Sequence, residues 1–247
     1  MRVALLSDVH SNLAALEAVI EAAHKAGAEA VWHMGDLVGY GPDPDAVVAV
    51  MQAEGAECVM GNHDAAALGL MPITDFNDMA KEAVLWTAAR ISEATRVFLS
   101  ALPQTRSDGR YTCCHGTLRD PLWEYLDTYD AARAHFDAQT TLCSIVGHTH
   151  RQILLTRGES GEIEALTPED GGVYAVAGAD TATRYCINPG GAGQPRDGDP
   201  RSCYALLDTS AGSVSFHRVA YDIATTQRRI REAGLPEALA ERLSIGR

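Results

Sequence analysis

Side chains that bind divalent metals follow five short apolar runs of this sequence. The candidates are two Asp, one Asn and four His: Asp8, His10, Asp36, Asn62, His115, His148 and His150. Short apolar runs bounded by Gly predict buried strands, and open α/β sheets build their sites at the carboxyl ends of such strands. Oxygen and imidazole donors without a thiolate favour two divalent metals, and the sequence does not choose among Mn, Fe, Zn and Ni.

The spacing within the blocks indicates how these side chains could share ions. One residue separates Asp8 from His10, and one separates His148 from His150. In an extended segment, alternation would place both members of each pair on the same side, where both can reach one ion. Asp36 follows a glycine, which would let metals approach closely, and its two carboxylate oxygens can bridge two ions. We therefore expect Asp36 to be the bridging ligand.

The order Asp-x-His, Gly-Asp, Gly-Asn-His-Asp, His-Gly and Gly-His-Thr-His resembles the calcineurin-like metallophosphoesterases over most of the chain. The resemblance assigns a first ion to Asp8, His10, Asp36 and His150. It assigns a second ion to Asp36, Asn62, His115 and His148. It also makes His63 the catalytic histidine, close to the metals but not a ligand.

The chemistry of such a site is phosphate-ester hydrolysis. Two ions about 3.5–4 Å apart can clamp a phosphate and lower the pKa of a bridging water towards about 7, so that a metal-bound hydroxide attacks phosphorus. His63 would donate to the leaving oxygen, a role worth ~10²–10⁴-fold in rate. We expect a metal-dependent phosphoric ester hydrolase that acts on a small phosphate ester, with a phosphodiester as the first choice.

Three alternatives remain. The enzyme could be a phosphomonoesterase or a dinucleoside polyphosphate hydrolase, which need the same metals. The same fold also serves as a catalytically silent protein-binding scaffold, although His63 and the complete ligand set argue against that role here.

Two segments narrow the resemblance to a small prokaryotic phosphodiesterase-like group: residues 35–44 and residues 188–201. Gly39 and Tyr40 stand where protein Ser/Thr phosphatases carry an Asp and a phosphate-gripping Arg. This departure disfavours a phosphoprotein substrate. It also makes Tyr40 a candidate substrate contact.

Arg196 is the candidate to replace the missing phosphate-gripping Arg, because a guanidinium can bind phosphate through two hydrogen bonds. The alternative is an exposed loop Arg that forms an ion pair with Asp197 or Asp199.

The arrangement of elements predicts the fold class. The first three predicted strands alternate with helices, which is typical of a parallel sheet with right-handed crossovers. The runs 184–187, 202–207 and 213–219 are expected to follow as antiparallel strands of a meander. Together they predict one α/β domain over residues 1–247, a four-layer α/β/β/α sandwich with two packed mixed sheets. The C-terminal helices, residues 222–243, are expected as an appendage to it.

Helix caps and loops follow from local sequence. Ser11 is expected to cap a helix that ends at Gly27, and Asp45 to cap a second helix. Residues 65–76 are expected to form a loop, and residues 168–183 match no element.

Composition excludes several functions. A net charge of -13 and a pI near 5.0 argue against nonspecific nucleic-acid binding, which needs clustered Lys and Arg. No run approaches the ~18 apolar residues of a membrane span, and we expect a cytoplasmic protein. Whether it forms a homo-oligomer is left open. The six Cys are expected to be buried, reduced thiols. The remaining histidines are expected to be structural: His24, His33, His135 and His217.

Overall fold

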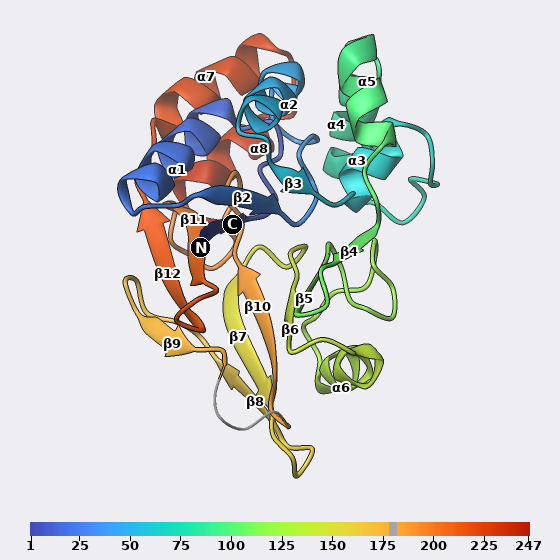
Figure 1. Ribbon diagram of the computed structural model, residues 1–247. Helices are drawn as coiled ribbons and strands as arrows, with labels where there is room; N and C mark the ends of the chain where they lie inside the picture. Colours follow the sequence, from blue (N-terminus) through green and yellow to red (C-terminus); the bar gives the residue numbers. More distant parts are fainter. Residues whose placement is uncertain (178–181) are drawn as a thin grey trace.

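The computed structural model describes residues 1–177 and 182–247. Two six-stranded sheets form its centre, and helices cover them on the outside (Figure 1). This is the predicted four-layer α/β/β/α sandwich with two mixed sheets, and the fold prediction is confirmed. No helix in the described part of the chain combines the length and the apolar character that crossing a bilayer requires.

The first sheet has the strand order β3-β2-β1-β11-β12-β9. Its strands are β1 Arg2–Leu6, β2 Ala30–His33, β3 Glu57–Cys58, β9 Val173–Ala175, β11 Ser202–Asp208 and β12 Ser213–Val219. Strands β1, β2 and β3 are parallel, as predicted from the alternation of strands and helices. Strand β11 pairs antiparallel with β1, and β12 with β11, so the sheet is mixed.

The second sheet has the order β4-β5-β6-β10-β7-β8. Its strands are β4 Thr105–Ser107, β5 Tyr111–Cys114, β6 Cys143–Ile145, β7 Gln152–Arg157, β8 Ile163–Leu166 and β10 Arg184–Pro189. The expected meander is wrong for β10, which pairs with β6 and β7 and not with β11. The loop 190–201 carries the chain from the second sheet to the first before β11 begins.

Both faces of β1 are buried, which explains its uninterrupted apolar sequence. Val3 and Leu5 join the cluster between the sheets. Ala4 and Leu6 point the other way and pack against helix α1, Leu13–Lys25. The core therefore has one layer between the sheets and another beneath the helices.

The other helices are α2 Pro44–Ala53, α3 Asn62–Ala67, α4 Asp78–Ala88, α5 Glu93–Ser100, α6 Tyr129–Ala138, α7 Ile223–Glu232 and α8 Glu237–Glu241, followed by the 3₁₀ turn Arg242–Ser244. Helix α3 occupies the start of the segment that was expected to be a loop. Strand β9 lies within residues 168–183, which the sequence left unassigned, and residues 178–181 of that segment lie outside the described residues.

Two predicted caps are wrong. Asn12, and not Ser11, caps α1, because its side-chain oxygen accepts from Ala15 N at 3.3 Å. Helix α2 begins at Pro44, a residue preorganised for the first helical position, so its N-cap is Asp43. Asp45 instead accepts hydrogen bonds from Ser92, the N-cap of α5, and its Oδ1 lies 3.0 Å from the Ser92 main-chain nitrogen.

The C-terminal helices pack closely on the rest of the molecule. Helix α7 lies beside α1 (Figure 1), and Thr226 of α7 donates to Asn12 Oδ1 at 2.9 Å. Ile230 and Leu239 belong to a buried cluster that includes Tyr40. Helices α7 and α8 thus reach the neighbourhood of the candidate site. The single-domain organisation stays a prediction.

Candidate metal centre

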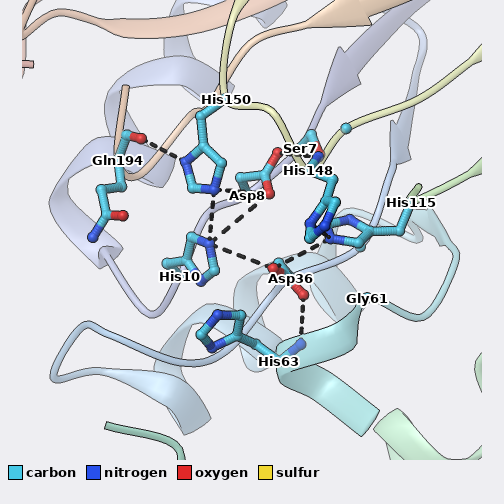
Figure 2. Close-up of polar contacts among 12 residues, drawn as sticks. Ser7, Asp8, His10, Asp36, Gly61, His63, His115, His148, His150 and Gln194 are labelled. Atoms are coloured by element: carbon cyan, nitrogen blue, oxygen red, sulfur yellow. Dashed lines mark hydrogen bonds and ion pairs between the residues drawn. The ribbon is translucent and has the colours of Figure 1, made fainter. Parts of the chain in front are cut away.

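Six of the seven predicted ligands lie together at one rim, where the carboxyl ends of strands from both sheets meet (Figure 2). The seventh, Asn62, begins α3, and its Oδ1 lies 3.0 Å from His115 Nε2. Three groups of side chains each have donor atoms within 4.8 Å of one another: Asp8, His10 and His150; Asp36, His115 and His148; and His10, Asp36 and His63. Within the described residues no other group of this kind occurs. The first two groups correspond to the two ions expected from the sequence.

The backbone at these positions differs from the prediction. Asp8 and His10 have φ angles of 55° and 49°, and His148 and His150 have φ angles of 65° and 58°. These values are left-handed, so the extended, alternating geometry expected for each pair is wrong. Such a conformation is costly for residues other than Gly and persists where surrounding contacts hold it. One such contact is the hydrogen bond from Asp8 N to Gly35 O, at 3.1 Å.

The role predicted for Gly35 also changes. A Cβ at Gly35 would lie 2.8 Å from the Gly61 main chain and 2.9 Å from His115 Nδ1. A Cβ at Gly61 would lie 2.1 Å from Asp36 Oδ1. These glycines therefore let two strand ends and the candidate ligand Asp36 pack against each other, and Gly35 faces Gly61 and the outer ring nitrogen of His115.

Each of the four candidate histidine ligands hydrogen-bonds a main-chain carbonyl with its outer ring nitrogen. The bonds are His10 Nδ1 to Val38 O at 3.1 Å, His115 Nδ1 to Met34 O at 2.7 Å, His148 Nε2 to Trp123 O at 3.0 Å and His150 Nδ1 to Gln194 O at 2.6 Å. A carbonyl only accepts, so each outer nitrogen must carry the hydrogen. In a neutral ring the inner nitrogen then presents a lone pair, the arrangement that metal-ligating histidines have.

These inner nitrogens face one another and the carboxylates. His10 Nε2 lies 3.3 Å from His150 Nε2, and His115 Nε2 lies 3.0 Å from His148 Nδ1. Asp36 Oδ2 lies 3.5 Å from His10 Nε2 and 3.3 Å from His115 Nε2, so this carboxylate stands between the two groups (Figure 2). Lone pairs that converge in a buried site need a cation between them. The donors present therefore fit two divalent metal ions.

Two side-chain oxygens also fit metal ions at this site. Asp8 Oδ1 is buried without a hydrogen-bond donor and lies 3.2 Å from His150 Nε2. Asn62 Oδ1 lies 3.0 Å from His115 Nε2, as expected for a neutral ligand of the second group. Buried polar atoms without partners are rare and call for an ion or a water.

The electrostatics of the centre also favour added positive charge. Burial raises the pKa of Asp8 to about 6. Burial would also raise the pKa of Asp36, but His115 and His63 outweigh it and hold that pKa well below its usual range. Burial alone would lower the pKa of His115, yet the Asp36 carboxylate raises it to about 9. The buried carboxylates thus stabilise a cation beside them.

His63 differs from the four candidate ligands. It lies in the first turn of α3 and not in an extended segment. Its Nδ1 is buried without a hydrogen-bond partner. Its ring packs against His10, Tyr40 and Phe76, with centroids 4.8, 4.4 and 5.0 Å away. Among the described residues no carbonyl fixes its tautomer. Burial lowers the pKa of His63 to about 4, so at neutral pH its ring is neutral and carries one N–H.

Asp64 contributes to the site, and we had assigned it no role. Its carboxylate accepts from the main-chain nitrogens of Asp36, Val38 and Gly61, at 2.9, 3.0 and 3.0 Å. It therefore fixes the loop that carries the bridging candidate. The signal was its place as the last residue of the Gly-Asn-His-Asp block.

Arg196 lies beside the metal centre. Its guanidinium donates to Gln194 Oε1 at 2.9 Å and lies 5.7 Å from the Tyr40 ring centroid. The alternative of an ion pair with a neighbouring Asp is wrong, because Asp197 pairs with Arg218 and Asp199 with Arg201.

Tyr40 is buried, and its ring lies 4.7 Å from the His10 ring. The phosphate contacts of Arg196 and Tyr40 stay predictions.

None of the remaining histidines and cysteines belongs to these three groups. All six Cys are buried and free. His135 is buried and bonded to Ser144 Oγ and Leu118 N. At the surface, His24 Nε2 lies 2.9 Å from Glu54 Oε2.

The family follows from comparison with known proteins. A sequence model of the calcineurin-like phosphoesterase superfamily domain matches residues 1–212. The chain belongs to this superfamily. The chain is 34% identical to Uncharacterized protein MJ0912 of Methanocaldococcus jannaschii, over 99% of this chain and 98% of that protein.

Two solved structures resemble the chain over its full length. The crystal structure of a metallophosphoesterase from Sphaerobacter thermophilus has 42% identity and a TM-score of 0.89, with 100% of this chain and 99% of that chain covered. The hypothetical protein PH1004 from Pyrococcus horikoshii OT3 has 19% identity and a TM-score of 0.77, with 100% and 98% covered. The second likeness concerns the fold alone.

Proposed function

We propose that this phosphoesterase uses two divalent metal ions to hydrolyse phosphodiesters. The ligands proposed for the first ion are Asp8, His10, Asp36 and His150. The ligands proposed for the second are Asp36, Asn62, His115 and His148. The observation that carries the proposal is the set of four carbonyl hydrogen bonds that turn one lone pair of each ligand histidine inwards.

The residues around the metals have separate tasks. When bound, two such ions activate a water nucleophile and neutralise charge on the phosphate. The His63 ring contacts the ring of His10, and its buried Nδ1 faces Gly39. Nε2 is therefore the nitrogen that would donate a proton to the leaving oxygen. Arg196 adds positive charge on the side of Tyr40. Asp64 holds the Asp36 loop in place.

The substrate preference rests on what the site lacks. At Gly39, where protein phosphatases carry an Asp, no side chain is present, and a Cβ there would lie 2.6 Å from His63 Nδ1. His63 therefore acts without the carboxylate that those enzymes use. Tyr40 takes the place of their phosphate-gripping Arg. We expect small diesters to be better substrates than phosphopeptides.

The test compares three substrates with the purified protein after loading with Mn²⁺, Fe²⁺, Zn²⁺ or Ni²⁺. We expect the rates to fall in the order bis-p-nitrophenyl phosphate, p-nitrophenyl phosphate, phosphoserine peptide. Elemental analysis should find close to two ions per chain. Turnover that is fastest with the peptide would contradict the substrate class. A fully loaded protein without turnover on any phosphate ester would favour the scaffold alternative.

A further inference from the structure

A groove of about 930 Å³ adjoins the metal centre, a volume typical of small-molecule sites. Its lining includes Tyr125, Thr149, Arg151, Arg196, Asp197 and Arg247. Thr149 lies between two candidate metal ligands in the sequence. The Tyr125 ring stacks on that of His148, with centroids 3.7 Å apart. The inner end of the groove therefore lies at the candidate metal centre. A substrate whose cleaved phosphate is bound at this centre would extend into the groove.

The groove is rich in arginine although the chain as a whole carries a net charge of -13. Arg151 and Arg196 form no ion pair with a carboxylate among the described residues. Arg151 Nε donates to the main-chain oxygen of Arg196 at 3.3 Å, which brings the two residues together. Arg196 Nε is buried without an acceptor. Of the two acidic residues in the lining, Asp197 is already neutralised by Arg218.

A third guanidinium lies close to the inner end. Arg242, from the 3₁₀ turn after α8, lies 5.9 Å from the Tyr40 ring centroid, and Arg196 lies 5.7 Å from the same centroid. Arg242 Nε contacts the main-chain oxygen of Arg247. Burial and the neighbouring Arg196 lower the pKa of Arg242 to about 10. Like charges held together in this way are stabilised by a bound anion.

We infer that the groove binds a second phosphate of the substrate, through Arg151 and Arg196. The preferred substrates are therefore organic phosphodiesters or polyphosphates with at least one phosphate beyond the one that is cleaved. Arginine is suited to this role because its planar fork donates two hydrogen bonds to one phosphate. The inference rests on the proposed function, since the cleaved phosphate must sit at the metals.

Two dinucleotides isolate the second phosphate: the diadenylate ApA and its 5′-phosphorylated form pApA contain the same internal diester. In the metal-loaded wild type, kcat/KM should be at least about tenfold higher for pApA than for ApA, because one charge-assisted hydrogen bond contributes about that much. Arg151→Ala should reduce the ratio of the two kcat/KM values towards one, and Arg151→Lys should restore part of it. Arg133→Ala, on the exposed face of α6 and paired with Asp130, is the matched control and should keep the wild-type ratio.

Binding provides a readout independent of turnover. On a His63→Ala background, isothermal titration should show tighter binding of pApA than of ApA, and Arg151→Ala should remove the difference. Equal values for both ligands, or a ratio that Arg151→Ala leaves unchanged, would overturn the inference while diester cleavage upheld the proposed function. Failure to cleave ApA, pApA and bis-p-nitrophenyl phosphate alike would instead contradict the proposed function.

Discussion

At the scale of single residues, the hydrogen bond on the far side of each imidazole separates the candidate ligands from the candidate acid. His10, His115, His148 and His150 each donate to a carbonyl, so in the neutral form of each ring the inner nitrogen can only accept or bind a cation. His63 has no such partner for Nδ1. Its ring is positioned by contacts with the rings of three neighbours. Burial lowers its pKa to about 4, so at neutral pH the neutral ring has one N–H to donate.

Replacing His63 should therefore separate catalysis from metal binding. For His63→Ala we expect both metals to be retained and kcat to fall by ~10²-fold or more, because the leaving oxygen loses its donor. The loss should shrink for diesters with strongly acidic leaving groups, which need little proton donation. Steady-state rates across a series of aryl diesters, together with elemental analysis, measure both effects.

The matched control is Phe76→Ala, which removes an aromatic contact of His63 without removing the imidazole. Loss of metal from His63→Ala would make His63 a ligand. An equal loss of rate for all leaving groups would exclude a proton-donating role.

At the scale of elements, helix α6 supports the loops that carry the second-sheet ligands. His135 of α6 contacts Ser144 of β6 at 2.7 Å and accepts from Leu118 N at 3.1 Å. Leu118 follows His115, and Ser144 precedes His148. Because Leu118 N donates to Nδ1, the His135 hydrogen must lie on Nε2. A second proton on Nδ1 would break the bond to Leu118.

This arrangement predicts a loss of stability in mild acid. Burial lowers the pKa of His135 to about 4, whereas an unfolded chain titrates near pH 6.5. As the pH falls below about 6.5, the unfolded state binds the proton first, so stability is lost down to about pH 4. Between about pH 7.5 and about pH 5.5, His135 alone should reduce the free energy of unfolding by about 1.3 kcal/mol.

Urea unfolding of wild type and His135→Gln at both pH values measures this contribution. The variant should be less stable at neutral pH. Its free energy of unfolding should fall less between the two pH values than that of the wild type, by about 1.3 kcal/mol. His24→Gln, at a surface histidine, should keep most of the wild-type pH dependence. The same pH dependence in His135→Gln as in wild type would refute the assignment.

At the scale of the whole molecule, the candidate metal centre lies between the two sheets. Asp8 and Asp36 follow strands of the first sheet, whereas His115 and His148 follow strands of the second. Ions bound between them would bind the folded state and not the unfolded one. Metal binding should therefore stabilise the packing of one sheet on the other.

Removal of metal should lower the thermal midpoint. Ions present at ~100 times their Kd stabilise by about 2.7 kcal/mol, which corresponds to roughly 5–10 °C for a chain of this size. Calorimetry before and after chelation, with metal added back, measures the shift. The Asp36→Asn variant, in which the proposed bridging ligand is weakened, should bind fewer ions. Its thermal midpoint should rise less when metal is added. If chelation left the thermal midpoint of the metal-loaded protein unchanged, metal binding would not stabilise the packing of the two sheets.

The sequence by itself determined which residue types meet at the site and which fold carries them. The order of the ligand blocks identified the superfamily, and the apolar runs before them located β1, β2, β5 and β6. Both inferences succeeded because a buried strand needs a continuous apolar run and a metal needs a narrow set of donors. Short segments of the sequence are enough to show that both requirements are met.

The tertiary structure decided the backbone and the partners of those residues. Asp8 and His10 converge through left-handed φ angles, which depend on hydrogen bonds to the loop around Asp36. The carbonyl partners of the four histidines come from Met34, Val38, Trp123 and Gln194. The pairing of β10 and the groove beside Arg151 also required the folded chain. These features arise between residues far apart in sequence, so no local pattern specifies them.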